Sequence, residues 1–143
     1  MTKCVFCNLL AGKLPSSVVY EDDAVCALLD IQPVNPGHTL VIPKTHFESL
    51  CEVPPDVLSR LIAAAQRVVE GFNNTDLACE GANLFLADGE AAGQEVPHVH
   101  LHVFPRVVGD GFGLRFGAGY KDLPTRETLD RVAASLRAAI AKG

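Results

Sequence analysis

The sequence predicts an α+β fold, in which a mostly antiparallel five-stranded sheet is covered by two main helices. Short segments rich in apolar residues, typical of strands, precede and separate two longer segments whose apolar residues recur at helical spacing. Few of the connections are long enough for the crossovers that parallel neighbours need. The chain has 143 residues, of which 48% are hydrophobic and 20% are charged, so we expect a single domain over residues 1–143.

The expected elements follow in the order strands, helix, strands, helix. A short helical turn is expected at 4–10, and the main helices at 56–72 and 125–142, where Thr125 is the predicted N-cap. The five strands are expected at 18–20, 24–29, 38–42, 84–87 and 98–104. A glycine-rich stretch at 109–119 is interpreted as a flexible flap.

Charge and cysteine content restrict the possible partners. The formal net charge of −5 argues against a broad nucleic-acid-binding surface, which is normally basic. The sequence has no run of 18 apolar residues and no signal peptide at its start, so we expect no membrane span and a cytoplasmic location. The five cysteines are an odd number, and three stand alone, which does not resemble a disulfide framework.

Three histidines, His98, His100 and His102, alternate with apolar residues. On a strand they would share one face, roughly 6–7 Å apart. Neutral imidazole is a good nucleophile near pH 7, because its ordinary pKa is about 6.5. The row is therefore a candidate site for histidine chemistry. The alternatives are the polar face of an amphipathic strand, or a metal site that uses part of the row.

The alternating histidines resemble the signature of the histidine-triad family. The resemblance extends to Asp30–Pro33, Pro36–Lys44, Asp88-Gly89 and Ala92-Gly93-Gln94, and to the Cys4–Cys7 segment, and it covers roughly residues 3–106. It implies cleavage at the α-phosphorus of a nucleoside phosphoramidate or dinucleoside polyphosphate, through a nucleotidyl-histidine intermediate and without a catalytic metal. It also implies a homodimer.

By this resemblance His100 is the nucleophile, and His102 and His38 orient it or contact the phosphate. Asp30 resembles the residue that accepts hydrogen bonds from the ribose hydroxyls, and a turn former is the alternative. Gln94 resembles a donor to a phosphoryl oxygen, and a solvent-facing loop residue is the alternative. The apolar residues around the base would be Val5, Phe6, Leu9 and Ile31, although core packing could explain each of them.

Two positions depart from the family pattern. Glu95 stands where many members carry serine or threonine, and a carboxylate beside a phosphate would repel it. Glu95 therefore turns away, contributes only its backbone N–H, or reads a cationic leaving group. Ala87 stands where relatives often place an amide side chain.

Cys4 and Cys7 have the spacing with which two thiolates reach one metal ion. In a bacterial branch of the family, such a pair resembles half of a zinc site. The histidine of a Pro-Lys-x-His motif, here His46, and the first triad histidine, here His98, complete it. The resemblance thus implies a structural zinc ion. The alternative is a pair of small buried cysteines with His46 on the surface.

Three functions remain open from the sequence. The first is a nucleotide hydrolase, the second a nucleotide-binding regulatory protein with negligible turnover, and the third a zinc-dependent structural module. Arg106 and Arg115 follow the triad and could approach a polyphosphate or a leaving group, although solvated arginines are the simpler interpretation.

Overall fold

The computed structural model describes residues 3–143. Internal contacts divide the chain into two units, and the boundary along the sequence lies between Phe112 and Gly113. The first unit contains the sheet and the second contains the last helix, and each is described by itself. The predicted single-domain organisation stays a prediction.

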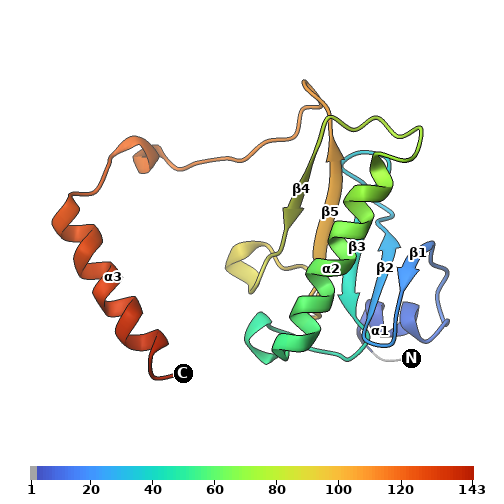
Figure 1. The fold of residues 1–143 in the computed structure, drawn as a ribbon, viewed down its shortest axis with the longest axis horizontal. Helices are drawn as coiled ribbons and strands as arrows, with labels where there is room; N and C mark the ends of the chain where they lie inside the picture. Colours follow the sequence, from blue (N-terminus) through green and yellow to red (C-terminus); the bar gives the residue numbers. More distant parts are fainter. Residues whose placement is uncertain (1–2) are drawn as a thin grey trace. The chain divides into compact units, whose positions relative to one another are not determined.

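The first unit is built on an antiparallel sheet of five strands (Figure 1). Its order is β1-β2-β3-β5-β4, and all four neighbouring pairs run antiparallel. The predicted α+β fold with a five-stranded sheet is therefore confirmed. The strands are β1 (Val18–Glu21), β2 (Val25–Leu29), β3 (Thr39–Pro43), β4 (Gly81–Phe85) and β5 (Leu101–Arg106).

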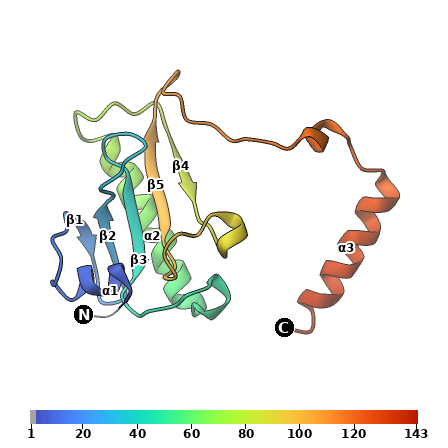
Figure 2. The same ribbon diagram turned by 180° about the vertical axis from the view of Figure 1, so that it is seen from behind.

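Helices pack on both faces of this sheet, as the opposite views of Figures 1 and 2 show. The helix α2 (Pro55–Phe72) covers one face, where its buried side chains meet alternate residues of β2, β3 and β5. The short helix α1 (Val5–Leu10) lies on the other face, where Phe6 packs against the side chains that point away from α2. These are Cys26, Leu28, Leu40 and Ile42.

The predicted strand at 98–104 is wrong at its start, because β5 begins only at Leu101. The backbone before it bonds to loops instead of to a strand: the N–H of Val99 donates to the Phe47 carbonyl, 2.8 Å away. Of the three histidines, only His102 therefore lies on a strand. The strand predicted at 84–87 is also shifted toward the N-terminus. The observed strand, β4, ends at Phe85, which pairs with His102.

The second unit contains a short 3₁₀ turn (Ala118–Lys121) and the helix α3 (Arg126–Ile140). The predicted N-cap is confirmed, since the Thr125 hydroxyl accepts a hydrogen bond from the N–H of Thr128. Two further 3₁₀ turns, at Leu50–Glu52 and Glu90–Ala92, were not predicted from the sequence. In the described part of the chain, no helix is long and apolar enough to span a membrane.

Candidate functional site

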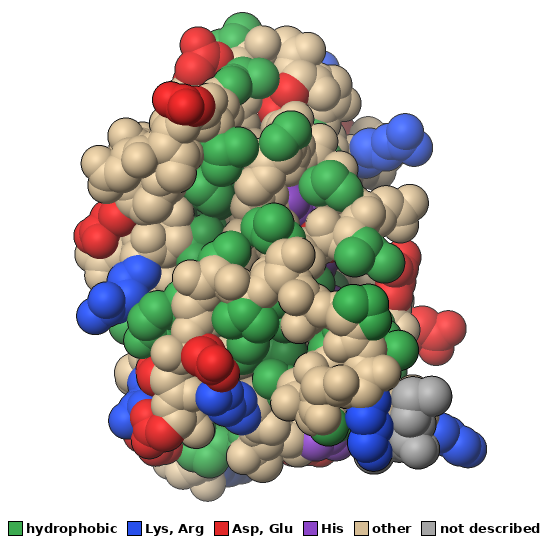
Figure 3. Space-filling model, turned by 90° about the vertical axis from the view of Figure 1, so that its right-hand side faces the viewer, with side chains coloured by type: hydrophobic (Ala, Val, Ile, Leu, Met, Phe, Trp, Pro, Cys, Tyr) green, Lys and Arg blue, Asp and Glu red, His purple; other side chains and the backbone are tan. Residues whose placement is uncertain are grey.

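A pocket of about 740 Å³ opens on the α1 face of the sheet. Its walls come from α1, the end of β2, the loop that follows β2, and β5. On the face shown in Figure 3, hydrophobic side chains gather with histidine visible between them. Eight of the predicted site residues line the pocket, namely Val5, Phe6, Leu9, Asp30, Ile31, His38, His100 and His102.

His100 lies against the pocket with a fixed ring orientation. Its Nδ1 atom is 2.7 Å from the backbone carbonyl oxygen of His98, and a carbonyl can only accept, so Nδ1 carries the proton. The other nitrogen, Nε2, then has a free lone pair. The ring is buried and packs between Phe6 and His102, with ring centroids 5.1 Å from each. This tautomer is the one that a nucleophilic imidazole requires.

A chain of hydrogen bonds fixes the other two histidines. The N–H of Val34 donates to Nδ1 of His38 over 2.9 Å, so the proton of His38 is on Nε2. That Nε2 lies 2.9 Å from Nδ1 of His102, which must therefore accept. His102 consequently carries its own proton on Nε2. A backbone amide thus determines the tautomer of a histidine that lines the pocket.

Local backbone geometry fixes the position of His38 in this chain of hydrogen bonds. Its N–H donates to the carbonyl of Asn35 and its carbonyl accepts from the N–H of Asp30. The residue before it, Gly37, has a φ of +99°, and a Cβ there would lie 2.8 Å from the Leu77 side chain. A glycine at position 37 is therefore needed both for the turn and for the close packing beneath it.

The site favours neutral imidazoles. Burial lowers the pKa of His102 to about 4, with a further contribution from the neighbouring His100 and His38. Burial also lowers the pKa of His38, and the Asp30 carboxylate, whose Oδ2 is 3.6 Å from Nε2 of His38, opposes this effect. Both rings are thus uncharged at neutral pH and act as directional donors and acceptors, not as cations.

The structure does not bring the Gln94 side chain to the pocket. Its amide nitrogen donates to the carbonyls of Glu48 and Val96, at 2.8 and 3.1 Å, and its Oε1 accepts from the N–H of Gly89 at 2.7 Å. The amide is used to tie three loop segments together, while the next residue, Glu95, lines the pocket. The predicted phosphate contact by Gln94 is therefore not part of this geometry.

The four predicted zinc ligands converge next to the pocket. Ligand atoms of Cys4, Cys7, His46 and His98 all lie within 4.8 Å of one another. The Sγ of Cys4 is 3.4 Å from Nδ1 of His98, and the Sγ of Cys7 is 3.4 Å from Nδ1 of His46 and 3.7 Å from Nδ1 of His98. The two Nδ1 atoms are 3.2 Å apart.

These separations match a tetrahedral zinc site. Zinc–ligand distances of about 2.3 Å to sulfur and about 2.05 Å to nitrogen place sulfur about 3.6 Å from nitrogen, and two nitrogens about 3.3 Å apart. In addition, Nε2 of His98 donates to the Pro43 carbonyl over 2.9 Å, which leaves the lone pair of Nδ1 toward the cluster. The residues present therefore fit a Cys₂His₂ zinc ion.

Several pocket residues were not predicted from the sequence. Phe85, Phe104 and Phe112 add aromatic walls near His102 and His38, and Phe104 lies 4.9 Å from the His38 ring. The alternation along β5 is the signal that could have found Phe104, because it places Phe104 on the same face of the strand as His102. No pattern in the sequence indicates that Phe112, within the glycine-rich stretch, lines the same pocket.

Comparisons with known proteins agree with this geometry. The model of the HIT domain family matches residues 11–108. An uncharacterized HIT-like protein of Methanocaldococcus jannaschii is 46% identical over 129 residues, which are 90% of this chain and 98% of that protein. The crystal structure of a HIT family member from Bacillus subtilis superposes with a TM-score of 0.85 at 38% identity, covering 95% of this chain and 96% of its own.

A further crystal structure, of a zinc-bound histidine triad family protein from Mycobacterium smegmatis, has a TM-score of 0.74 and 41% identity. It covers 98% of this chain and 94% of its own. Proteins of the HIT domain family bind nucleotides and are generally nucleotide hydrolases. The family match and the similarity along nearly the whole chain show that this protein belongs to the HIT domain family.

Proposed function

We propose that the protein hydrolyses a nucleoside phosphoramidate or a dinucleoside polyphosphate at the α-phosphorus, with His100 as the nucleophile. The orientation of His100 carries this proposal, because its Nδ1–H donates to the His98 carbonyl and Nε2 is left with a lone pair beside a pocket. Family membership supports the nucleotide class of the substrate.

In the first step, the Nε2 lone pair of His100 forms a bond to phosphorus and the bond to the leaving group breaks. The leaving atom keeps that electron pair and takes a proton from solvent. The His100 ring becomes positively charged, and the His98 carbonyl, 2.7 Å from Nδ1, stabilises this charge. A water molecule then attacks phosphorus, the bond to Nε2 breaks, and the proton lost by the water returns to solvent.

The two other site histidines support this chemistry as neutral groups. The proton on Nε2 of His102 is a hydrogen-bond donor for a non-bridging phosphoryl oxygen. His38 holds His102 in this tautomer through the 2.9 Å contact between them. We propose that Asp30 receives the ribose hydroxyls through its Oδ2 atom, since Oδ1 already accepts from the N–H of Gln32 over 2.8 Å. The exposed Ile31 and the α1 residues Val5, Phe6 and Leu9 would surround the base.

The covalent intermediate provides the sharpest test. Rapid acid-free quenching of wild-type enzyme during turnover of a nucleoside phosphoramidate should show, by mass spectrometry, one nucleoside monophosphate attached to the peptide that contains His100. The His100→Ala protein should lack this adduct and lose at least about 10³-fold in kcat. Full turnover by His100→Ala would contradict the proposal.

A binding measurement distinguishes the regulatory alternative. Isothermal titration of His100→Ala with a nucleoside monophosphate should retain affinity, because the pocket walls remain. If the wild-type protein binds the nucleotide but turns over neither substrate class and forms no adduct, the protein is a nucleotide-binding regulator instead.

We also propose a structural zinc ion held by Cys4, Cys7, His46 and His98. The fit of the four ligand separations to a zinc tetrahedron supports it. A zinc ion there would anchor α1 to the segment before β5, because its ligands come from both. Elemental analysis should find one zinc per chain in the wild type and none in Cys7→Ser, which should also melt at a lower temperature. The variant Cys51→Ser, which changes an exposed cysteine outside the cluster, should keep both properties.

A homodimer and a cytoplasmic location complete the proposal. The strand β4 forms one edge of the sheet, with Leu84 and Phe85 each nearly half exposed, which leaves a surface on which a second copy could pair. Analytical ultracentrifugation of the whole chain would decide between monomer and dimer.

A further inference from the structure

The charged groups around the pocket are unequal in sign. Among the described residues that line it, the two carboxylates Asp30 and Glu95 are the acidic groups, and neither lysine nor arginine is present. A polyphosphate leaving group would bring several negative charges into these surroundings, where the sequence offers no lining cation to receive them. Of the two substrate classes of the proposed function, the charge distribution therefore disfavours the dinucleoside polyphosphates.

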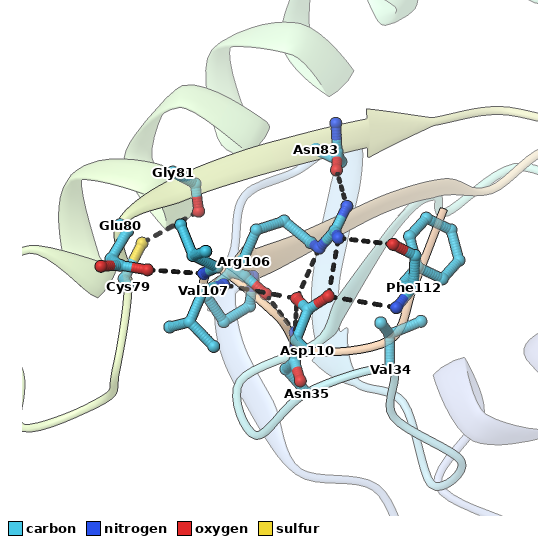
Figure 4. A network of polar contacts seen from close by, with 12 residues as sticks. Val34, Asn35, Cys79, Glu80, Gly81, Asn83, Arg106, Val107, Asp110 and Phe112 are labelled. Atoms are coloured by element: carbon cyan, nitrogen blue, oxygen red, sulfur yellow. Dashed lines mark hydrogen bonds and ion pairs between the residues drawn. The ribbon is translucent and has the colours of Figure 1, made fainter. Parts of the chain in front are cut away.

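Arg106, which contacts the pocket-lining residue Phe112, is engaged in a network of polar contacts (Figure 4). Its Nε and Nη2 donate to both oxygens of Asp110 at 2.6 and 2.7 Å, and its Nη1 donates to Asn83 at 2.6 Å. Nη2 also donates to the Phe112 carbonyl, and the guanidinium lies 4.8 Å from the centre of the Phe112 ring. Asn35 donates to the same Asp110 carboxylate at 2.8 Å.

Because of this network, the Arg106 guanidinium is not available to bind a substrate. The Asp110 side chain is buried, and its contact with the guanidinium holds the pKa of the carboxyl well below its usual range. The positive charge of Arg106 is therefore neutralised at close range. What remains at the pocket is a wall in which Phe112 packs edge-on against Phe104, with ring centroids 5.1 Å apart.

Glu95, by contrast, is exposed and is held in place by its neighbours. The preceding Gln94 uses both ends of its amide to tie the segment to Gly89 and Glu48, and the following Val96 packs into the core on the α1 face. The backbone of Glu95 is thus fixed between two anchored residues. Glu95 is one of the residues that line the pocket containing His100 and His102.

We propose that Glu95 selects substrates whose leaving group carries a positive charge, so that the substrate class is a nucleoside phosphoramidate of an amine with a second, cationic amino group. This inference rests on the proposed hydrolase function. The nucleoside contacts of the proposed function are Asp30, Ile31 and the α1 residues, and they do not include Glu95, which we assign to the leaving group. A carboxylate there attracts an ammonium and repels a polyphosphate.

A matched pair of substrates tests the proposal. One is the nucleoside phosphoramidate of a linear diamine, which keeps a free ammonium, and the other is that of a monoamine with the same chain length. An exposed ion pair supports a preference in kcat/KM for the cationic member of about two- to fivefold. The ratio should fall toward one at high ionic strength, because salt screens exposed charges.

Variants at Glu95 separate charge from shape. Glu95→Gln should bring the ratio close to one, and Glu95→Lys should invert it and raise kcat/KM for a dinucleoside polyphosphate. The control Glu90→Gln removes an exposed carboxylate from the same loop, outside the pocket lining, and should keep the wild-type ratio.

The outcomes separate the two levels of inference. A wild-type enzyme that turns over both phosphoramidates, but whose ratio is unchanged by salt and by Glu95→Gln, overturns the role of Glu95 and leaves the hydrolase function intact. A wild-type enzyme with no turnover of any of the three substrates overturns the proposed function itself.

Discussion

The depressed pKa of His102 predicts a specific loss of stability in acid. Because its folded pKa is lowered from 6.5 to about 4, the folded protein binds a proton less readily than the unfolded chain. The group therefore contributes its full stabilisation above pH 6.5, and this stabilisation is lost as the pH falls toward 4. When the pH is lowered from neutral to about 5, the stabilisation is lost only over the part below the unfolded-state pKa of 6.5, which is about 1.5 pH units. Each of these units lowers the free energy of unfolding by at most about 1.4 kcal/mol. The ceiling is therefore about 2 kcal/mol.

Partial exposure reduces this value. The His102 side chain is 22% exposed, so we expect a loss of about 1–2 kcal/mol in the free energy of unfolding. The assay is urea unfolding, followed by circular dichroism near pH 7 and near pH 5, of the wild type and of His102→Gln. The glutamine keeps an acceptor for Nε2 of His38 and removes the titrating ring.

The comparison between the two proteins isolates His102. Protonation of the proposed zinc ligands and of His38 should also destabilise the fold in acid, but both proteins share those groups and their effects should largely cancel. The wild type should lose about 1–2 kcal/mol more than His102→Gln between the two pH values. Equal losses in the two proteins would refute the assignment of a buried, neutral His102.

Two further predictions concern the hydrogen-bonded histidines and the arginine network. Long-range ¹H–¹⁵N NMR spectra at neutral pH should show the proton on Nδ1 of His100 and on Nε2 of both His38 and His102. The opposite tautomer at His102 would contradict the chain of hydrogen bonds that begins at the Val34 amide. Asp110→Asn should lower the urea midpoint, because it removes the anionic partner of the Arg106 guanidinium. The matched control Asp130→Asn, which changes an exposed carboxylate on α3, should leave the midpoint nearly unchanged, and a similar shift in both variants would show that the network adds no stability.

Much of the fold could be predicted from the sequence because its signals are local. Helical spacing of apolar residues locates α2 and α3 to within two residues at each end. The ligand set Cys4, Cys7, His46 and His98 came from the resemblance to the family, and the structure brings all four together. Spacing along the chain cannot by itself show that His46 and His98, separated by 52 residues, meet.

The details that escape sequence reasoning depend on which partner a polar group finds. Alternation predicted three histidines on one strand, but the N–H of Val99 bonds to a loop carbonyl and the strand starts later. The motif placed Gln94 near a phosphate, yet its amide bonds to three backbone groups in two loops. The Arg106–Asp110 pair has no local signature beyond a separation of four residues, which outside a helix does not predict a contact.

The late start of β5 explains how three alternating histidines serve two different sites. On a continuous strand, His98 and His100 would point to the same side, and one would compete with the other for space and for metal. Because the backbone leaves the sheet before Leu101, His98 turns its Nδ1 to the cysteines, while its carbonyl stays 2.7 Å from Nδ1 of His100. The residue that fits the zinc site thus also sets the tautomer of the proposed nucleophile. Loss of the metal should therefore act on the nucleophile through the position of the His98 carbonyl, with His100 itself unchanged.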